Sequence, residues 1–157
     1  MILDTPLGHL TLAFDAAGGA ALTRLAFVEE PPSDARPPEA GAAKTVAALR
    51  AYFDGDLAAL EALPVAPRGT PFQLEVWRAL RRVPPGATAS YGAIARELGT
   101  SPRAVGAANG ANPIALVVPC HRVFGKGGAL TGYAYGLPRK RWLLAHEGAL
   151  GALPLVS

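Results

Sequence analysis

The stretch SPRAVGAANGANPIALVVPCHRV, residues 101–123, decides the fold of the second half of the chain. It opens on Ser101 and a proline, a typical helix start, and runs through small residues to Asn112-Pro113, where a helix must stop. An apolar run, residues 114–118, then leads to Cys120, the single cysteine of the chain. The pattern predicts a short helix over residues 102–110, followed by a buried strand with the thiol at its end.

A second short helix is predicted immediately upstream, capped by Ser90, running through Leu98 and stopped by Gly99. Two short helices joined by a tight, glycine-containing turn in a basic region match a helix-turn-helix pattern. Thr70-Pro71-Phe72-Gln73 has the composition of a capping box with proline at the first helical position, so another helix starts there. Pro138 opens the last predicted helix.

The first half of the chain has a different pattern, in which short apolar runs alternate with turn residues. Residues 2–3, 9–14 and 22–28 predict three strands, and residues 42–53 predict a helix. We therefore predict an α+β fold with a small strand-rich domain over residues 1–66 and a mainly helical domain over residues 67–157.

Composition excludes several classes of protein. Of the 157 residues 50% are hydrophobic and 17% are charged, enough apolar side chain for a packed core. One cysteine excludes an internal disulfide framework and a cysteine-rich zinc site. Because no apolar run is long enough to span a bilayer and the first residues lack the pattern of a signal peptide, we expect a cytoplasmic protein without a membrane partner.

Charge divides the chain at the same boundary as the strand and helix patterns. Residues 1–66 hold four basic and nine acidic side chains, a net charge of −5, whereas residues 67–157 hold eleven basic and three acidic ones, a net charge of +8. Arginine supplies most of the positive charge and suits phosphate contacts. The asymmetry indicates either a nucleic-acid partner for the second half or ordinary surface charge.

Cys120 is the candidate nucleophile, because it stands directly beside His121 and Arg122 at the edge of a glycine-rich loop. A thiol reacts as its thiolate, and neighbouring positive charge lowers its pKa. The alternative is a buried structural cysteine. Successive side chains of a strand point to opposite faces, so the thiol and the imidazole meet only if the chain turns sharply at Pro119 or a water molecule joins them.

The predicted helix over residues 102–110 is also a candidate for DNA contact. Its small residues Ala104, Gly106 and Ala107 permit close approach either to a narrow minor groove or to another helix. Backbone N–H groups at its start, around Thr100 and Ser101, are positioned to hold a phosphate.

Taken together, these residues resemble the O6-alkylguanine-DNA alkyltransferases, also called methylated-DNA–protein-cysteine methyltransferases. The resemblance covers essentially the whole second half in unbroken order, whereas the first half is similar only in layout, which implies an RNase H-like fold there. The motifs that carry it are Gly69-Thr70-Pro71-Phe72, Tyr91, Arg103-Ala104-Val105-Gly106, Asn112-Pro113, Pro119-Cys120-His121-Arg122-Val123, Gly132-Tyr133 and Leu143-Leu144-Ala145-His146-Glu147-Gly148.

The resemblance implies a mechanism for each matching residue. Cys120 would attack the alkyl carbon on guanine O6. Because no step regenerates the thiol, each protein molecule would act once. His121 would take the thiol proton through a bound water, and Glu147 would orient that imidazole. Tyr91 would donate a proton or hydrogen bond to the leaving guanine, and Asn112 matches the family's hinge asparagine.

The resemblance also implies how the base is held. Arg103 would enter the space that the flipped base leaves in the duplex, with the helix in the minor groove. Val123 and Ala134 would contact the guanine through their backbone, beside Tyr133 in the pocket. Tyr135 departs from the family, which usually has glycine there, and we expect it to reduce tolerance of large O6 adducts.

The implied partner is double-stranded DNA containing O6-alkylguanine, bound by a monomer, with O4-alkylthymine an open further substrate. No cofactor and no metal site are expected, because His9 and His146 have too few ligand residues around them. Three alternatives stay open: a lesion sensor of the same fold that does not transfer the alkyl group, a Cys–His hydrolase, and a helix-turn-helix transcription regulator.

Overall fold

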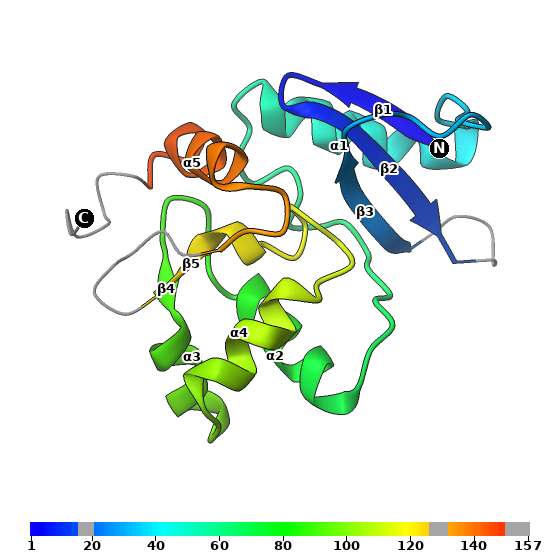
Figure 1. The fold of residues 1–157 in the computed structure, drawn as a ribbon. Coiled ribbons are helices and arrows are strands. Elements are labelled where there is room, and N and C mark those ends of the chain that lie inside the picture. The colour runs from blue at the N-terminus through cyan, green and yellow to red at the C-terminus, as the bar shows by residue number, and fades with distance from the viewer. Residues whose placement is uncertain (16–20, 126–131, 150–157) are drawn as a thin grey trace. The chain divides into compact units, whose positions relative to one another are not determined.

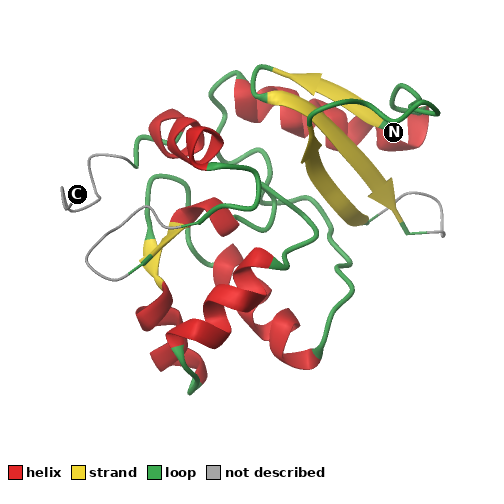
Figure 2. Ribbon diagram, in the orientation of Figure 1, coloured by secondary structure: helices red, strands yellow, loops and turns green. Residues whose placement is uncertain are grey.

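The computed structural model describes residues 1–15, 21–125 and 132–149, and the chain divides into two compact units. The first unit holds Met1–Arg68 together with Pro113–Val117, and the second holds Gly69–Asn112 and the chain from Val118 onward. Strands predominate in the first unit and helices in the second (Figure 2). The predicted α+β fold class is confirmed. None of the described helices has the length and apolar character needed to cross a membrane.

The first unit is built on a three-stranded antiparallel sheet in the order β1-β2-β3 (Figure 1). The strands are β1 (Ile2–Thr5), β2 (Gly8–Phe14) and β3 (Leu22–Val28), close to the three predicted apolar runs. Leu10 of β2 pairs with Phe27 of β3, and both are buried. Alternation of apolar and polar residues thus places one face of β2 in the core.

Helix α1 (Ala43–Phe53) follows a 3-10 turn, η1 (Ala40–Ala42), at the place where the sequence predicts a helix. Its buried residues are Thr45, Leu49 and Tyr52. Helical spacing in the sequence predicts one face with Ala42, Val46, Leu49 and Phe53. Ala42 and Leu49 are buried, whereas Val46 and Phe53 are partly exposed. The large side chain of Tyr52 is fully buried in place of Phe53, so the buried face of α1 is shifted by one residue from the predicted one.

Residues 113–117 join the first unit by pairing with β3. The N–H of Leu25 donates to Pro113 at 3.0 Å, and the N–H of Ala115 donates back to Leu25 at 2.8 Å. The predicted strand over residues 114–118 is wrong, because only the isolated bridge between Leu25 and Ile114 forms and Leu116 takes a left-handed φ of 68°. The apolar run is nevertheless buried, and residues 114–117 are grouped with the first unit, whereas Val118 is grouped with the second.

Four α-helices form most of the second unit: α2 (Pro71–Arg81), α3 (Tyr91–Leu98), α4 (Pro102–Gly110) and α5 (Leu137–His146). The predicted caps are confirmed. Thr70 forms a capping box with Gln73, and Ser90 and Ser101 accept hydrogen bonds from N–H groups of the helices that they open. Gly99 ends α3 with a φ of 68°, the left-handed conformation that glycine adopts without strain.

A short parallel pairing positions the two parts of the second unit that matter most for chemistry. Strand β4 (Ala89–Ser90) directly precedes α3, and strand β5 (Val123–Phe124) directly follows a 3-10 turn, η2 (Cys120–Arg122). Ala89 pairs with Val123 and Ser90 with Phe124. The pairing therefore brings the beginning of α3, with Tyr91, to the segment that carries Cys120.

Candidate active site

Cys120 is presented by a sharp turn and not by the end of a regular strand. Pro119 has φ −82° and ψ 68°, and the N–H of Cys120 donates to the carbonyl of Val118 at 2.8 Å, the geometry of an inverse γ-turn. The N–H of Arg122 then donates to Pro119 at 3.0 Å as η2 begins. The chain thus turns sharply at Pro119, but His121 Nδ1 has no hydrogen-bond partner among the described residues, so the turn does not join the imidazole directly to the thiol.

The two residues that follow Cys120 in the chain belong to a buried cluster, in which His121 and Arg122 both contact Glu147. His121 Nε2 lies 2.8 Å from Glu147 Oε2. Arg122 holds the same carboxylate with two hydrogen bonds, Nε to Oε1 at 2.8 Å and Nη2 to Oε2 at 2.9 Å. Its Nη1 donates to the carbonyl of Val83 at 2.7 Å, which anchors the guanidinium. Bidentate, charge-assisted pairing fixes the orientation of the carboxylate.

The Glu147 contact determines which nitrogen of His121 can act as a base. An ionised carboxylate only accepts hydrogen bonds, so Nε2 carries the hydrogen and a neutral imidazole has its lone pair on Nδ1. No group in the described ranges lies within hydrogen-bond reach of the buried Nδ1. The ring is thus oriented by one nitrogen and available at the other.

Burial and the cluster shift the pKa values in opposite directions. Burial would raise the pKa of Glu147, but hydrogen bonds from His121 and Arg122 and their charges outweigh it and hold the pKa far below its usual range. Burial lowers the pKa of His121, and the Glu147 contact only partly opposes this. At neutral pH the site therefore holds a carboxylate and a neutral imidazole, which is the form that can accept a proton.

The thiol itself is more basic than the sequence suggested. Burial raises the pKa of Cys120, while a hydrogen bond from Asn112 and the charge of Lys140 oppose the shift. Positive charge does lower this pKa, as expected, but the charge is that of Lys140, while Arg122 is engaged with Glu147, and burial outweighs it, so the net shift is upward. A buried neutral thiol needs a base, and His121 is the neighbouring group in the right protonation state.

Lys140 of α5 places a buried amine in the same region. Its Nζ donates to the carbonyl of Val123 at 2.6 Å and to that of Gly132 at 3.2 Å. Burial lowers the pKa of Lys140 to about 8, with the charge of Cys120 opposing the shift. Lys140 thus ties β5 to the start of the segment that leads into α5 and supplies positive charge to the thiol.

Asn112 and Tyr91 approach the Cys120 segment from other elements. Asn112 Nδ2 donates to the carbonyl of Val118 at 2.7 Å, across the turn that presents the thiol. Burial raises the pKa of the Tyr91 hydroxyl, which the side chain of Asn109 opposes by a hydrogen bond at 3.5 Å. Tyr91 is therefore a protonated hydroxyl at neutral pH.

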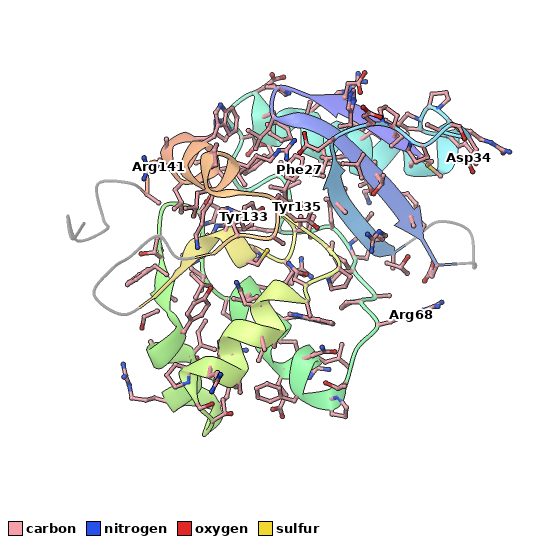
Figure 3. The ribbon with its side chains drawn as sticks, in the orientation of Figure 1. Phe27, Asp34, Arg68, Tyr133, Tyr135 and Arg141 are labelled. Atoms are coloured by element: carbon pink, nitrogen blue, oxygen red, sulfur yellow. The ribbon has the colours of Figure 1, made fainter. Side chains whose placement is uncertain are left out.

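These residues surround a cavity of about 310 Å³ within the second unit. Tyr133 and Tyr135 form one side, with their rings 5.4 Å apart at an angle of 75°, and they lie close together in Figure 3. Val123, predicted as a pocket residue, is fully buried in β5 beside the cavity-lining residues and is not part of the wall. The lining residues are Tyr91, Gly106, Asn109, Gly110, Asn112, Cys120, Gly132, Tyr133, Ala134 and Tyr135.

Helix α4 exposes the residues that were predicted to face DNA. Arg103 and Ala107 are exposed, and Ala104 and Gly106 are half-exposed. A Cβ built at Gly106 would meet no described atom within 4 Å, so packing inside the unit does not require glycine there. The N–H of Thr100 donates to the carbonyl of Ala95 at 2.9 Å as part of the end of α3, and the contact of Thr100 with a phosphate stays a prediction.

Comparison with known proteins places this site in a family. The family model described as "6-O-methylguanine DNA methyltransferase, DNA binding domain" matches residues 71–149. A methylated-DNA–protein-cysteine methyltransferase of Mycobacterium bovis is 48% identical over 151 residues, which are 92% of this chain and 89% of that protein. The chain belongs to the 6-O-methylguanine DNA methyltransferase family.

A solved structure and a second relative by sequence are also similar to this chain. The structure of Mycobacterium tuberculosis OGT in complex with DNA has a TM-score of 0.80 and 45% identity, covering 98% of this chain and 94% of that one. A Shigella flexneri methylated-DNA–protein-cysteine methyltransferase is 58% identical over 104 residues. That alignment covers 65% of this chain and 61% of the relative, so the chain spans less than two thirds of that protein's length.

Three buried polar residues of this family member were not predicted from sequence as parts of the site: Asn109, Arg122 and Lys140. Arg122 stands in the Pro-Cys-His-Arg-Val motif, and a charged residue beside a buried histidine was the signal available. Asn109 and Lys140 gave no such signal, because nothing in a local pattern shows that a helix will bury one polar side chain.

The remaining histidines have ordinary surroundings. His9 Nδ1 lies 2.5 Å from Asp4 Oδ1 on neighbouring strands, and the ring of His146 stacks on Trp142 at 4.8 Å. In the described parts of the chain, three or more potential histidine, cysteine or carboxylate ligands do not gather around one point.

Proposed function

We propose that this protein repairs DNA directly, by transferring an alkyl group from guanine O6 in a duplex to Sγ of Cys120. The observation that carries the proposal is a single thiol in the wall of a cavity of about 310 Å³, followed in the chain by a His121–Glu147 pair. A cavity of this size suits a small ligand such as a base turned out of the stack. The relatives' names give methylated DNA and a protein cysteine as the reactants, and the family model's description gives 6-O-methylguanine, which supports this reaction.

The residues divide the reaction into balanced proton and bond changes. His121 Nδ1 takes the thiol proton through a water molecule, while Nε2 stays on Glu147 and the carboxylate stabilises the resulting cation. Sγ of Cys120 attacks the alkyl carbon in line, the C–S bond forms, and the C–O6 bond breaks with its electron pair left on guanine. Tyr91 donates a proton to the guanine, and the proton released by the thiol restores the tyrosine.

The product explains why each molecule acts once. The alkyl group ends on a thioether, which has no acyl carbon for water to attack, and none of the proposed steps breaks the C–S bond. The thiol and the alkylated base supply all the atoms and electrons of the proposed reaction, so it needs no cofactor.

For DNA binding we propose that the exposed face of α4 enters the minor groove of double-stranded DNA. Arg103 occupies the space vacated by the flipped base, and the small side chains at Ala104, Gly106 and Ala107 allow close approach to the backbone. Ser101, at the N-terminus of α4, lies near a phosphate, where helix N-termini favour negative charge. Asn112, after α4, acts as the hinge residue between this helix and the Cys120 turn.

The rest of the chain has a supporting role in this proposal. We assign residues 1–66 to an RNase H-like domain, residues 67–157 to the DNA-binding transferase domain, and the protein to the cytoplasm as a monomer on chromosomal DNA. The backbone of Ala134 and the ring of Tyr133, which line the cavity, hold the flipped base.

The test is intact-mass spectrometry after incubation with a slight excess of duplex containing O6-methylguanine. We expect a mass gain of one methyl group per protein, mapped to Cys120, and no further product with time. Cys120→Ala and an undamaged duplex of the same sequence are the controls, and neither should give a gain.

Two results would overturn the proposal. Tight, lesion-selective binding without a mass gain would make the protein a sensor, and repeated turnover without protein alkylation would make it a hydrolase. A parallel duplex with O4-methylthymine determines whether the same thiol accepts that substrate.

A further inference from the structure

Asn109 is a buried amide in the last turn of α4, only 6% exposed, and it lies between two parts of the proposed transfer machinery. Its Nδ2 is 3.3 Å from the carbonyl oxygen of Cys120 and 3.5 Å from the hydroxyl oxygen of Tyr91. The residue also lines the cavity. One side chain therefore contacts the backbone of the nucleophile and the proposed proton donor.

The Cys120 carbonyl fixes which way the amide points. A carbonyl oxygen only accepts hydrogen bonds, so the nitrogen of Asn109 and not its oxygen must face it. The same nitrogen has a second hydrogen, which is directed at the Tyr91 oxygen. Tyr91 thus accepts in this contact, and its own hydrogen is not consumed by it.

The direction of this hydrogen bond matters for the chemistry. A phenol that accepts from a fixed donor has its own O–H turned to another acceptor, and the described residues provide none for Tyr91. Because Tyr91 lines the cavity, an acceptor on a bound base is the partner left to it. The bond from Asn109 also lowers the pKa of Tyr91 against the larger effect of burial, which makes the hydroxyl a better donor.

Asn109 is a poor choice for stability alone. Its Oδ1 is buried, and no group in the described part of the chain lies within hydrogen-bond reach of it. An unsatisfied buried oxygen is destabilising, and it offsets part of the stabilisation from the hydrogen bond that Nδ2 donates to the Cys120 carbonyl. A purely structural role therefore does not explain an amide at this position.

We propose that Asn109 is a positioning residue for alkyl transfer: it orients the Tyr91 hydroxyl as a donor toward the bound base and holds the backbone of Cys120 at the cavity. This rests on the proposed function, and it assigns to α4 a role in the chemistry in addition to its role in DNA binding.

A double-mutant cycle between Asn109→Leu and Tyr91→Phe tests the proposal. The single-turnover rate of methyl transfer from an O6-methylguanine duplex and the melting temperature are measured for wild type, both single variants and the double variant. We expect Asn109→Leu to slow transfer about ten-fold, equal to about 1.4 kcal/mol. The melting temperature should change little, because leucine leaves the Cys120 carbonyl without its donor but also removes the unsatisfied Oδ1. In the Tyr91→Phe background, the same substitution should slow transfer by a clearly smaller factor.

Asn109→Asp is a further test, because aspartate has nearly the shape of asparagine but, when ionised, can only accept hydrogen bonds. An ionised carboxylate would accept the Tyr91 hydrogen and so reverse the bond, and we expect slower transfer than with Asn109→Leu. Equal rates for wild type and Asn109→Leu, or equal fold-effects with and without the Tyr91 hydroxyl, would overturn the proposal. Absence of transfer by the wild type would instead contradict the proposed function, which the wild-type rate reports separately.

Discussion

The two units differ in what they bury. In the described part of the first unit Thr45 is the buried polar side chain, within a core of leucine, isoleucine, valine, alanine, phenylalanine and tyrosine. Among the described residues of the second unit six polar side chains are buried: Asn109, Asn112, His121, Arg122, Lys140 and Glu147. Four of these six are ionisable, and all lie on or near the Cys120 segment.

This difference shows how stability and chemistry are distributed along the chain. An apolar core stabilises a fold without directional demands, whereas buried charges are costly unless every one is paired. The second unit meets that demand with Glu147, which accepts from His121 and Arg122, and with the backbone carbonyls that hold Lys140. Such an arrangement is typical of a site where groups must be held in fixed protonation states.

The largest effect is expected from removing the charge at the centre of the cluster. Glu147→Gln leaves Arg122 buried without its counter-charge and should cost about 3–5 kcal/mol of unfolding free energy. It should also slow methyl transfer by at least about a hundred-fold, because His121 loses the group that orients it and stabilises its cation. Chemical denaturation and single-turnover rates measure the two effects.

A variant in the first unit serves as the control for Glu147→Gln, because it should lower stability without slowing methyl transfer. Leu49→Ala removes a fully buried side chain of α1 and should cost about 2–5 kcal/mol of unfolding free energy. Below its unfolding temperature it should transfer methyl groups at the wild-type rate. A comparable loss of rate in Leu49→Ala and Glu147→Gln would show that the site does not depend on its own cluster.

A smaller effect is expected from acid, and it should be confined to the second unit. The folded pKa values of His121 and Glu147 both lie below their ordinary values, so the unfolded chain binds more protons as pH falls. Stability from His121 is thus lost as pH falls below about 6.5, and stability from Glu147 as it falls below about 4.3. Hydrogen exchange, corrected for intrinsic rates, should show protection decreasing in α5 and remaining in β2. Equal decreases in both would contradict the assignment.

The smallest effect concerns the cavity wall. Tyr135 packs edge-to-face on Tyr133, and a ring at this position should exclude a bulky adduct. We expect Tyr135→Gly to raise the transfer rate from O6-benzylguanine relative to O6-methylguanine about three- to ten-fold, within the range of pocket discrimination. Equal rates on the two substrates, unchanged by the substitution, would refute the steric role.

The helices of the second unit were predictable because their signals are local. A capping serine or threonine acts on an N–H within three residues, and Gly99 ends α3 by its own backbone conformation, so Ser90, Ser101 and Thr70 could be assigned from sequence. The proposed nucleophile was likewise evident as the one cysteine in a distinctive motif. By contrast, the predicted strand at residues 114–118 was wrong, because an apolar run shows burial but not whether partner strands are in register.

Sequence alone therefore determined the α+β class, the capped helices, the family and the identity of the candidate thiol, since each depends on residue types at short spacing. Only the tertiary structure decided that Glu147, besides its contact with His121, also holds Arg122, 25 positions away, and that Asn109 joins Tyr91 to Cys120. It also decided the sign of the Cys120 pKa shift. The physical reason is the same in each case: burial and the directions of hydrogen bonds arise from how distant segments pack, and neighbouring residues in the chain do not contain that information.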